Sequence, residues 1–313
     1  MRLAMVRETL VILLTFDVLT SPASARSIVV PPGPGTPIQD AINSASAGDT
    51  IRLRYGTYNE SVTIDRAIKV RGRPALGLNS VRIDAGCNTA AALTIAADGV
   101  RVRDVEVVGG TRYTIDIEGR SRVVLRGVVT GEPAFFGCRA SGYDVEYGIN
   151  VFNSTNLRIS RCLVLGDSGG WTGPWGYTDA GIYIGGIPAN GNVRVSRNLV
   201  VGSNRGILVE DSADDVGGRV GVLVKRNLST SCDTAIFLHN SDRIRLVSNV
   251  ANDSRESPAP AFGIHVDVDS NDNLIARNKS TGNVADVQDD NGFNCWRKNE
   301  FTTGTLPLTS SCP

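Results

Sequence analysis

Short strands with alternating apolar and polar residues recur along most of the chain. The segment GIHV at 263–266 has relatives that start at residues 148 (GINV), 181 (GIYI), 206 (GILV) and 235 (AIFL). Successive copies are therefore 33, 25, 29 and 28 residues apart. A second apolar segment follows each copy and ends in one residue of this series: Cys162, Asn198, Asn227, Asn249, Asn278. A period of this length predicts a repeat architecture.

Each repeat holds two or three strands of three to five residues, separated by Gly, Asn, Asp or Ser. Parallel strands of a βαβ protein need helical crossovers, and these connectors are too short for them. A solenoid buries such strands because each one pairs in parallel with its copy in the next coil. The terminal Asn residues should then stack and hydrogen-bond along the solenoid. Cys162 falls in the same column, so we expect it to be a buried thiol.

The segment 36–64 differs from the repeats and predicts a helix followed by strands. Pro37 should begin the helix and Gly48 should end it, and the helix can cover the open end of a solenoid. This segment resembles the pectin-lyase-like superfamily of parallel β-helix proteins. The matching residues are Ile38-Gln39, Ala41-Ile42, Ala47-Gly48-Asp49-Thr50-Ile51 and Gly56-Thr57-Tyr58.

The resemblance implies an all-β fold, a right-handed parallel β-helix of about ten coils with an N-terminal capping helix. We expect one domain over residues 26–301, with its cap at 36–60 and a C-terminal tail at 302–313. The superfamily contains lyases, hydrolases, epimerases, phage tailspikes and non-enzymatic accessory proteins, so the resemblance does not specify a function.

Residues 1–25 have the pattern of a signal peptide. Arg2 and Arg7 precede a short apolar run at 10–20, and Ala23-Ser24-Ala25 provides a small-x-small cleavage pattern. The alternative is an uncleaved anchor, but the run is short for a membrane span. We therefore expect a secreted or periplasmic protein with no membrane span in the mature chain.

Six Cys fit an oxidising compartment, and Cys295–Cys312 is the disulfide that we predict. The other pairings cannot be read from the sequence. Lys+Arg and Asp+Glu number 32 each, which argues against a nucleic-acid partner. We expect a monomer.

Alternation along the GI strands separates inward from outward positions. Ile149, Ile182, Ile207, Ile236 and Ile264 should point inward. The first outward column is Asn150, Tyr183, Leu208, Phe237 and His265, and the second is Phe152, Gly185, Glu210, His239 and Asp267. Both His of the chain therefore fall on one outer face, where two carboxylates flank His239. The alternative reading is an ordinary cross-strand charge column.

Long inserts at 131–147, 167–179 and 253–260 precede GI strands and should rise at one edge of this face. Exposed aromatic side chains along a groove suit a sugar polymer, although the Trp side chains could instead pack their own loop. The residues that we expect to bind substrate are Trp171, Trp175, Asp179, Phe237, Asn150, Arg205 and Arg243.

Three functions compete. The first is a lyase or epimerase on a uronic-acid polysaccharide, with His239 or His265 as base and Tyr183 as acid. Arg205, Arg243 or a bound calcium ion would neutralise the substrate carboxylate. The second is an inverting glycoside hydrolase that uses Glu210 and Asp267.

The third function is non-catalytic binding or an accessory role, because the repeats also resemble periplasmic accessory proteins of copper-enzyme maturation. Copper handling is disfavoured, since the chain has two Met, both within residues 1–25, and two His. No metal site is predicted. The segment 267–273 echoes a calcium loop but lacks the Gly and Glu of an EF-hand.

Overall fold

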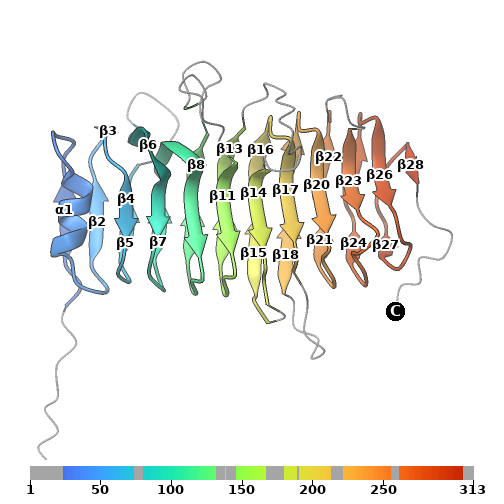
Figure 1. The fold of residues 1–313 in the computed structure, drawn as a ribbon, viewed down its shortest axis with the longest axis horizontal. Helices are drawn as coiled ribbons and strands as arrows, with labels where there is room; N and C mark the ends of the chain where they lie inside the picture. Colours follow the sequence, from blue (N-terminus) through green and yellow to red (C-terminus); the bar gives the residue numbers. More distant parts are fainter. Residues whose placement is uncertain are drawn as a thin grey trace, which may run out of the picture.

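The computed structural model describes residues 24–73, 80–131, 138, 146–166, 180–188, 190–212, 221–254 and 261–305. It is a right-handed parallel β-helix whose coils stack along one long axis (Figure 1). Helix α1 (Pro37–Ser44) lies at one end and strand β28 (Gly304–Thr305) at the other. The predicted fold is confirmed.

One wall of the solenoid is an 11-stranded parallel sheet. Its strands are β1 (Ser27–Val30), β2 (Thr50–Leu53), β5 (Lys69–Arg71), β7 (Arg101–Arg103), β9 (Val124–Arg126), β12 (Arg158–Ser160), β15 (Val193–Ser196), β18 (Val222–Lys225), β21 (Arg245–Val247), β24 (Leu274–Ala276) and β27 (Cys295–Arg297).

The second wall, called here the GI sheet, contains the GI segments. Its strands are β4 (Val62–Ile64), β6 (Val81–Ile95), β8 (Glu106–Glu118), β11 (Tyr147–Phe152), β14 (Ala180–Gly185), β17 (Arg205–Glu210), β20 (Thr234–His239), β23 (Phe262–Val266), β26 (Ala285–Asp289) and β28.

The third wall is formed by shorter strands, and the first halves of β6 and β8 contribute to it. The other members are β3 (Gly56–Tyr58), β10 (Val129–Thr130), β13 (Leu163–Leu165), β16 (Leu199–Val201), β19 (Leu228–Thr230), β22 (Val250–Asn252) and β25 (Lys279–Thr281).

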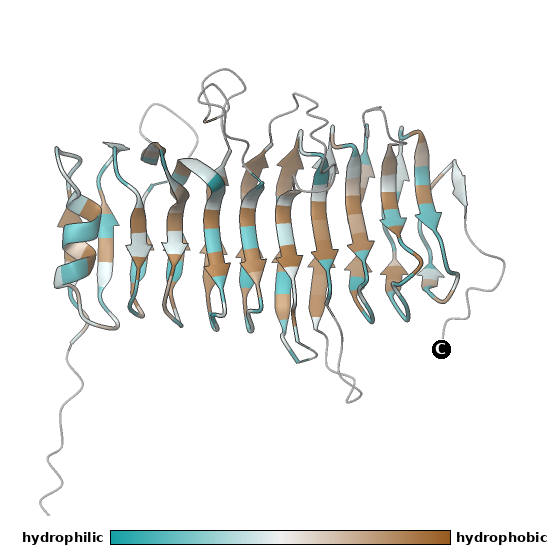
Figure 2. Ribbon diagram, in the orientation of Figure 1, coloured by the Kyte–Doolittle hydropathy of each residue, from teal (hydrophilic) through white to brown (hydrophobic). Residues whose placement is uncertain are grey.

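The core is a set of stacked aliphatic columns inside these walls. Equivalent Ile residues pair in register from coil to coil, as Ile182 with Ile207 and Ile236 with Ile264. All five inward Ile of the GI segments are at most 1% exposed. Figure 2 shows the resulting alternation of hydrophobic and hydrophilic bands along the strands. Burying each such side chain stabilises the fold by about 1.5–3 kcal/mol.

The predicted Asn ladder is present in the turn between the 11-stranded sheet and the third wall. The side-chain amide of Asn198 donates to Oδ1 of Asn227, and the amide of Asn227 donates to Oδ1 of Asn249, both at 3.0 Å. The ladder continues through Asn278. Cys162 takes the first place in the column and is a buried free thiol, as predicted.

Helix α1 covers one end of the core with Ile38, Ala41 and Ile42. Glu60 accepts hydrogen bonds from the first backbone amides of the helix, with the Ile38 nitrogen 2.8 Å from its carboxylate. The helix ends at Ser44, before the predicted stop at Gly48, because the backbone becomes extended at Ala45.

The disulfides follow only part of the prediction. Cys87 and Cys138 form a disulfide, with their Cα atoms 5.1 Å apart, and the sequence did not indicate this pair. Cys295 is also disulfide-bonded, and its predicted partner Cys312 lies outside the described residues. Cys232 is a second buried free thiol.

Asp286 anchors the last coil. Burial alone would raise its pKa, but hydrogen bonds from Thr302, Asn283 and Thr303 lower the pKa to about 2. The ionised carboxylate therefore stabilises the folded chain above the unfolded pKa, and this stabilisation is lost as the pH falls through about 2.

We expect Asn227→Ala to lower the free energy of unfolding by about 2–4 kcal/mol, because it leaves buried partners in two neighbouring coils unsatisfied. Chemical denaturation measures this loss. Asn43→Ala, at an exposed helical position, is the control and should change stability by less than about 0.5 kcal/mol. Equal effects of the two substitutions would contradict the structural role of the ladder.

We expect Asp286→Asn to cost about 2 kcal/mol at neutral pH and progressively less as the pH falls from about 4 to about 2. Urea unfolding at several pH values measures the difference from the wild type. The exposed Asp253→Asn serves as control. A cost that does not change with pH would show that the charge of Asp286 is not what stabilises the last coil.

Candidate functional site

Three neighbouring strands of the GI sheet and the turn after a fourth bring together a row of polar side chains. The register places Tyr183 beside Leu208 and Glu210 beside His239, as alternation predicted. Asp267 follows β23 directly. We call Tyr183, Glu210, His239 and Asp267 the GI-face cluster.

His239 lies between two carboxylates. Its Nδ1 atom is hydrogen-bonded to Asp267, and its Nε2 atom is 3.8 Å from Oε1 of Glu210. Because a carboxylate only accepts hydrogen bonds, Nδ1 must carry a proton. In the tautomer that this bond selects, Nε2 carries the lone pair, and the His239 side chain is 46% exposed.

Asp267 is itself held in place from its own turn and from the preceding coil. Its carboxylate accepts hydrogen bonds from the Ser270 hydroxyl at 2.7 Å and from the Asn240 backbone amide at 3.2 Å. The residue is 8% exposed. The orientation of the His239 ring is therefore fixed by a carboxylate that cannot easily move.

Tyr183 is buried, although alternation predicted an outward position. Its hydroxyl donates to Oε2 of Glu210 at 2.8 Å, and its ring stacks on Tyr147 with centroids 4.3 Å apart. Burial, the hydrogen bond to Glu210 and the charge of Glu210 all raise the pKa of Tyr183. Burial and the same carboxylate raise the pKa of Tyr147 to about 12.

Phe237 lies between the two His rings. Its centroid is 4.7 Å from that of His265 and 5.6 Å from that of His239. Arg205 covers the same ring, with its guanidinium carbon 5.2 Å from the centroid. His265 differs from His239, because its Nε2 is hydrogen-bonded to Asp290 at 2.9 Å and its side chain is 19% exposed.

The remaining candidate site residues lie in different environments. Asn150 is buried and donates to Asp116 at 2.7 Å. Arg243 lies in the turn before β21, where its guanidinium is 3.7 Å from Asp272. Three further candidates, Trp171, Trp175 and Asp179, lie outside the described residues.

Sequence reasoning missed three features around the cluster. Tyr113, Tyr147 and Tyr183 form a stack over successive coils, with centroids 5.7 and 4.3 Å apart. The Ser270 hydroxyl and Asp290 were also not anticipated. Tyr113 and Tyr147 are register partners, so extending the alignment upstream would have indicated that pair, whereas Tyr147 aligns with Ala180 and its stacking on Tyr183 does not follow from the register.

In the described part of the chain, no group of three or more His, Cys, Asp or Glu side chains could hold a metal ion. The described residues also contain no helix that is long and apolar enough to span a membrane.

Solved structures with similar folds include polysaccharide-acting enzymes. An alginate lyase from Paenibacillus sp. str. FPU-7 aligns with a TM-score of 0.55 and 16% identity over 90% of this chain and 97% of its own. An endo-xylogalacturonan hydrolase from Aspergillus tubingensis aligns with a TM-score of 0.58 and 12% identity over 92% and 98%. At this identity the likeness concerns the fold alone. No curated protein sequence matches the chain.

A family model supplies the closer relationship. Residues 43–306, which make up most of the solenoid, match the model described as periplasmic copper-binding protein (NosD). The periplasmic description and the Cys87–Cys138 disulfide are both consistent with the expected location outside the cytoplasm. The chain belongs to the NosD family.

Proposed function

We propose that this protein acts on a uronic-acid polysaccharide by lyase or epimerase chemistry at the GI-face cluster. The observation that carries the proposal is the pairing of His239 Nδ1 with Asp267, which leaves Nε2, 3.8 Å from Glu210, on a side chain that is 46% exposed. A side chain held in this way can remove the proton α to a carboxylate. We also propose that residues 1–25 direct the export of the protein.

Each residue of the GI-face cluster named below has its own role in the proposed reaction. His239 is the base, and Asp267 is a positioning residue that fixes the tautomer and orientation of the ring. Glu210 is 3.8 Å from Nε2 and stabilises the imidazolium that forms when His239 takes the proton. In a lyase the electron pair left on carbon forms a double bond as the bond to the leaving oxygen breaks, and that oxygen takes a proton from solvent. In an epimerase a proton from solvent adds to the opposite face of the same carbon.

The negative charge that develops on the substrate carboxylate needs a cation. Arg205 is the candidate, because its guanidinium covers the Phe237 ring that also stacks near His239. Calcium is proposed as an alternative cation, but no step is assigned to it, because the described residues provide no cluster that could hold a metal.

The bonding of the two carboxylates favours proton abstraction over hydrolysis. An inverting hydrolase needs one carboxyl to protonate the leaving oxygen and another to activate water. Glu210 is already bonded to Tyr183, and Asp267 is bonded to Ser270, Asn240 and His239. Neither carboxylate is therefore free for water in this arrangement.

Membership in the NosD family favours a second candidate, a non-catalytic accessory role. The copper in the description of the family does not fit the described residues. Both free thiols are buried, burial raises the pKa of Cys162 to about 11, and both His rings are bonded to carboxylates. The two Met of the chain lie outside the described residues. We therefore derive no step through copper.

We expect His239→Gln to reduce turnover of the preferred uronan by at least about 100-fold while leaving the fold intact. The assay follows the ultraviolet absorbance of unsaturated ends on polygalacturonate, alginate and related uronans, with calcium and with a chelator. Proton exchange from the substrate into heavy water detects an epimerase.

Asp98→Asn is the matched control, because it removes a carboxylate that pairs with Arg122 away from the GI face. Unchanged turnover in the His239 variant would refute the proposed base. Reducing ends without absorbance would indicate a hydrolase. Binding without any turnover in the wild type would favour the accessory role.

We expect Tyr183 to ionise above the usual range of tyrosine, because its neutral hydroxyl is buried and donates to Glu210. The difference between alkaline ultraviolet titrations of the wild type and Tyr183→Phe isolates this group among the seven Tyr. In a Glu210→Gln background the same difference should move to lower pH, since the carboxylate charge is removed. A midpoint unaffected by Glu210→Gln would contradict the coupling on which the cluster is built.

A further inference from the structure

Although charges balance over the whole chain, the wall formed by the 11-stranded sheet is strongly basic. The strands of the 11-stranded sheet carry eleven Lys or Arg and no Asp or Glu, whereas the whole chain has 32 of each kind. Among the described residues, none of these eleven cations forms an ion pair. The acidic residues that balance them lie on other parts of the protein.

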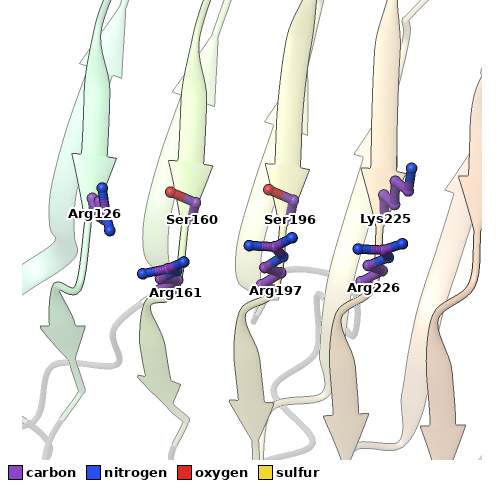
Figure 3. A pocket seen from close by; sticks show the side chains of 7 residues that line it. All are labelled: Arg126, Ser160, Arg161, Ser196, Arg197, Lys225 and Arg226. Carbon is purple, nitrogen blue, oxygen red and sulfur yellow. The ribbon is translucent and has the colours of Figure 1, made fainter.

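Two of these strand cations, Arg126 and Lys225, join three Arg of the following turns at a hollow where the 11-stranded sheet turns toward the third wall (Figure 3). Its lining comes from four successive coils: Arg126, Ser160, Arg161, Ser196, Arg197, Lys225 and Arg226. Five of these seven residues are cationic and the other two are serines. Figure 3 shows Arg161, Arg197 and Arg226 in a row, one on each coil.

The backbone conformation at these three Arg residues is energetically unfavourable. Arg161, Arg197 and Arg226 have φ values of 56°, 58° and 57°, in the left-handed region. This conformation costs a non-glycine residue about 1–2 kcal/mol. Gly127 and Ser248 occupy the same turn position in other coils, with φ values of 63° and 58°, so the turn itself does not need Arg.

Electrostatic repulsion adds to this cost. Neighbouring coils are about 4.8 Å apart. At that distance two like charges in water repel by about 0.9 kcal/mol. No carboxylate in the described part of the chain pairs with Arg161, Arg197 or Arg226 to offset this repulsion, which favours an anionic ligand at these positions.

We propose that this hollow and the cations beside it bind an extended acidic polysaccharide along the solenoid axis. Arg161, Arg197 and Arg226 recur once per coil, and the rise of a coil is close to the length of one sugar unit in an extended chain. Ser160 and Ser196 lie between the cations, where their hydroxyls can bond to sugar hydroxyls. The surface is separate from the GI face, so it would hold the polymer independently of the chemistry there.

A nucleic acid fits this wall less well. Proteins that bind single strands stack the bases on exposed aromatic side chains. The only aromatic residue in the strands of the 11-stranded sheet is Trp296, which packs against the core and donates to Asp289. The wall therefore offers charge and hydroxyl groups but no stacking platform.

The test uses Arg197→Gly together with Arg226→Gly. Glycine suits the left-handed turn, so the double variant should fold with a melting temperature close to that of the wild type. We expect its affinity for polygalacturonate or alginate to fall at least about tenfold at low salt, and its salt dependence to weaken. Affinity electrophoresis in gels with and without the polymer measures both.

Arg122→Gly is the matched control for Arg197→Gly. Arg122 also has a left-handed backbone, with φ of 58°, but it pairs with Asp98 outside the hollow. Its removal should leave affinity unchanged. Dextran measures binding to a neutral polymer, and single-stranded DNA measures binding to a nucleic acid.

Wild-type affinity in the double variant would overturn the proposal, as would equal binding to dextran. Retention of DNA without retention of either uronan would assign the wall to nucleic acid instead. Because the assay needs no turnover, it is independent of the proposed chemistry. If His239→Gln abolished binding and the double variant did not, the polymer would be held at the GI face and this inference would fail.

Discussion

The whole structure depends on the in-register stacking of parallel coils. Each inward Ile lies on the Ile of the next coil, and each buried Asn donates to the next Asn at about 3.0 Å. The two contacts have different roles. Hydrophobic burial holds the walls together, whereas the Asn ladder satisfies buried polar groups of the turn that only one register can satisfy. As a result, equivalent outward side chains are also spaced regularly from coil to coil.

This stacking turns residues that are far apart in sequence into continuous outer rows. Glu210, His239 and Asp267 come from segments about one repeat apart, yet they form one row in which His239 is hydrogen-bonded to Asp267 and lies 3.8 Å from Glu210. The same geometry aligns Arg161, Arg197 and Arg226 on another wall. A solenoid therefore provides two elongated surfaces of opposite character, one with acid–base groups and one with uncompensated cations.

In our proposals the two surfaces have separate roles, chemistry at one and polymer binding at the other. The family description mentions neither role. Copper requires soft or clustered ligands, and the described residues provide none in a suitable arrangement. A charged polymer requires repeated cations and hydroxyls, and these are present along the solenoid. The row of cations along the solenoid is the basis on which we propose a long anionic ligand for this NosD-family chain.

The sequence by itself determined the repeat, the inward Ile columns, the Asn ladder and the placement of both His on one face, because these follow from alternation and a fixed period. It did not determine which outward side chains are exposed. Tyr183 is buried and bonded to Glu210, and the carboxylates near His239 and His265 differ in how they bind the ring. The basic wall was visible in segments such as VRVSRN at 193–198, but net charge concealed it. Only the tertiary structure decided these points, because they depend on contacts between coils and on which wall each charge occupies.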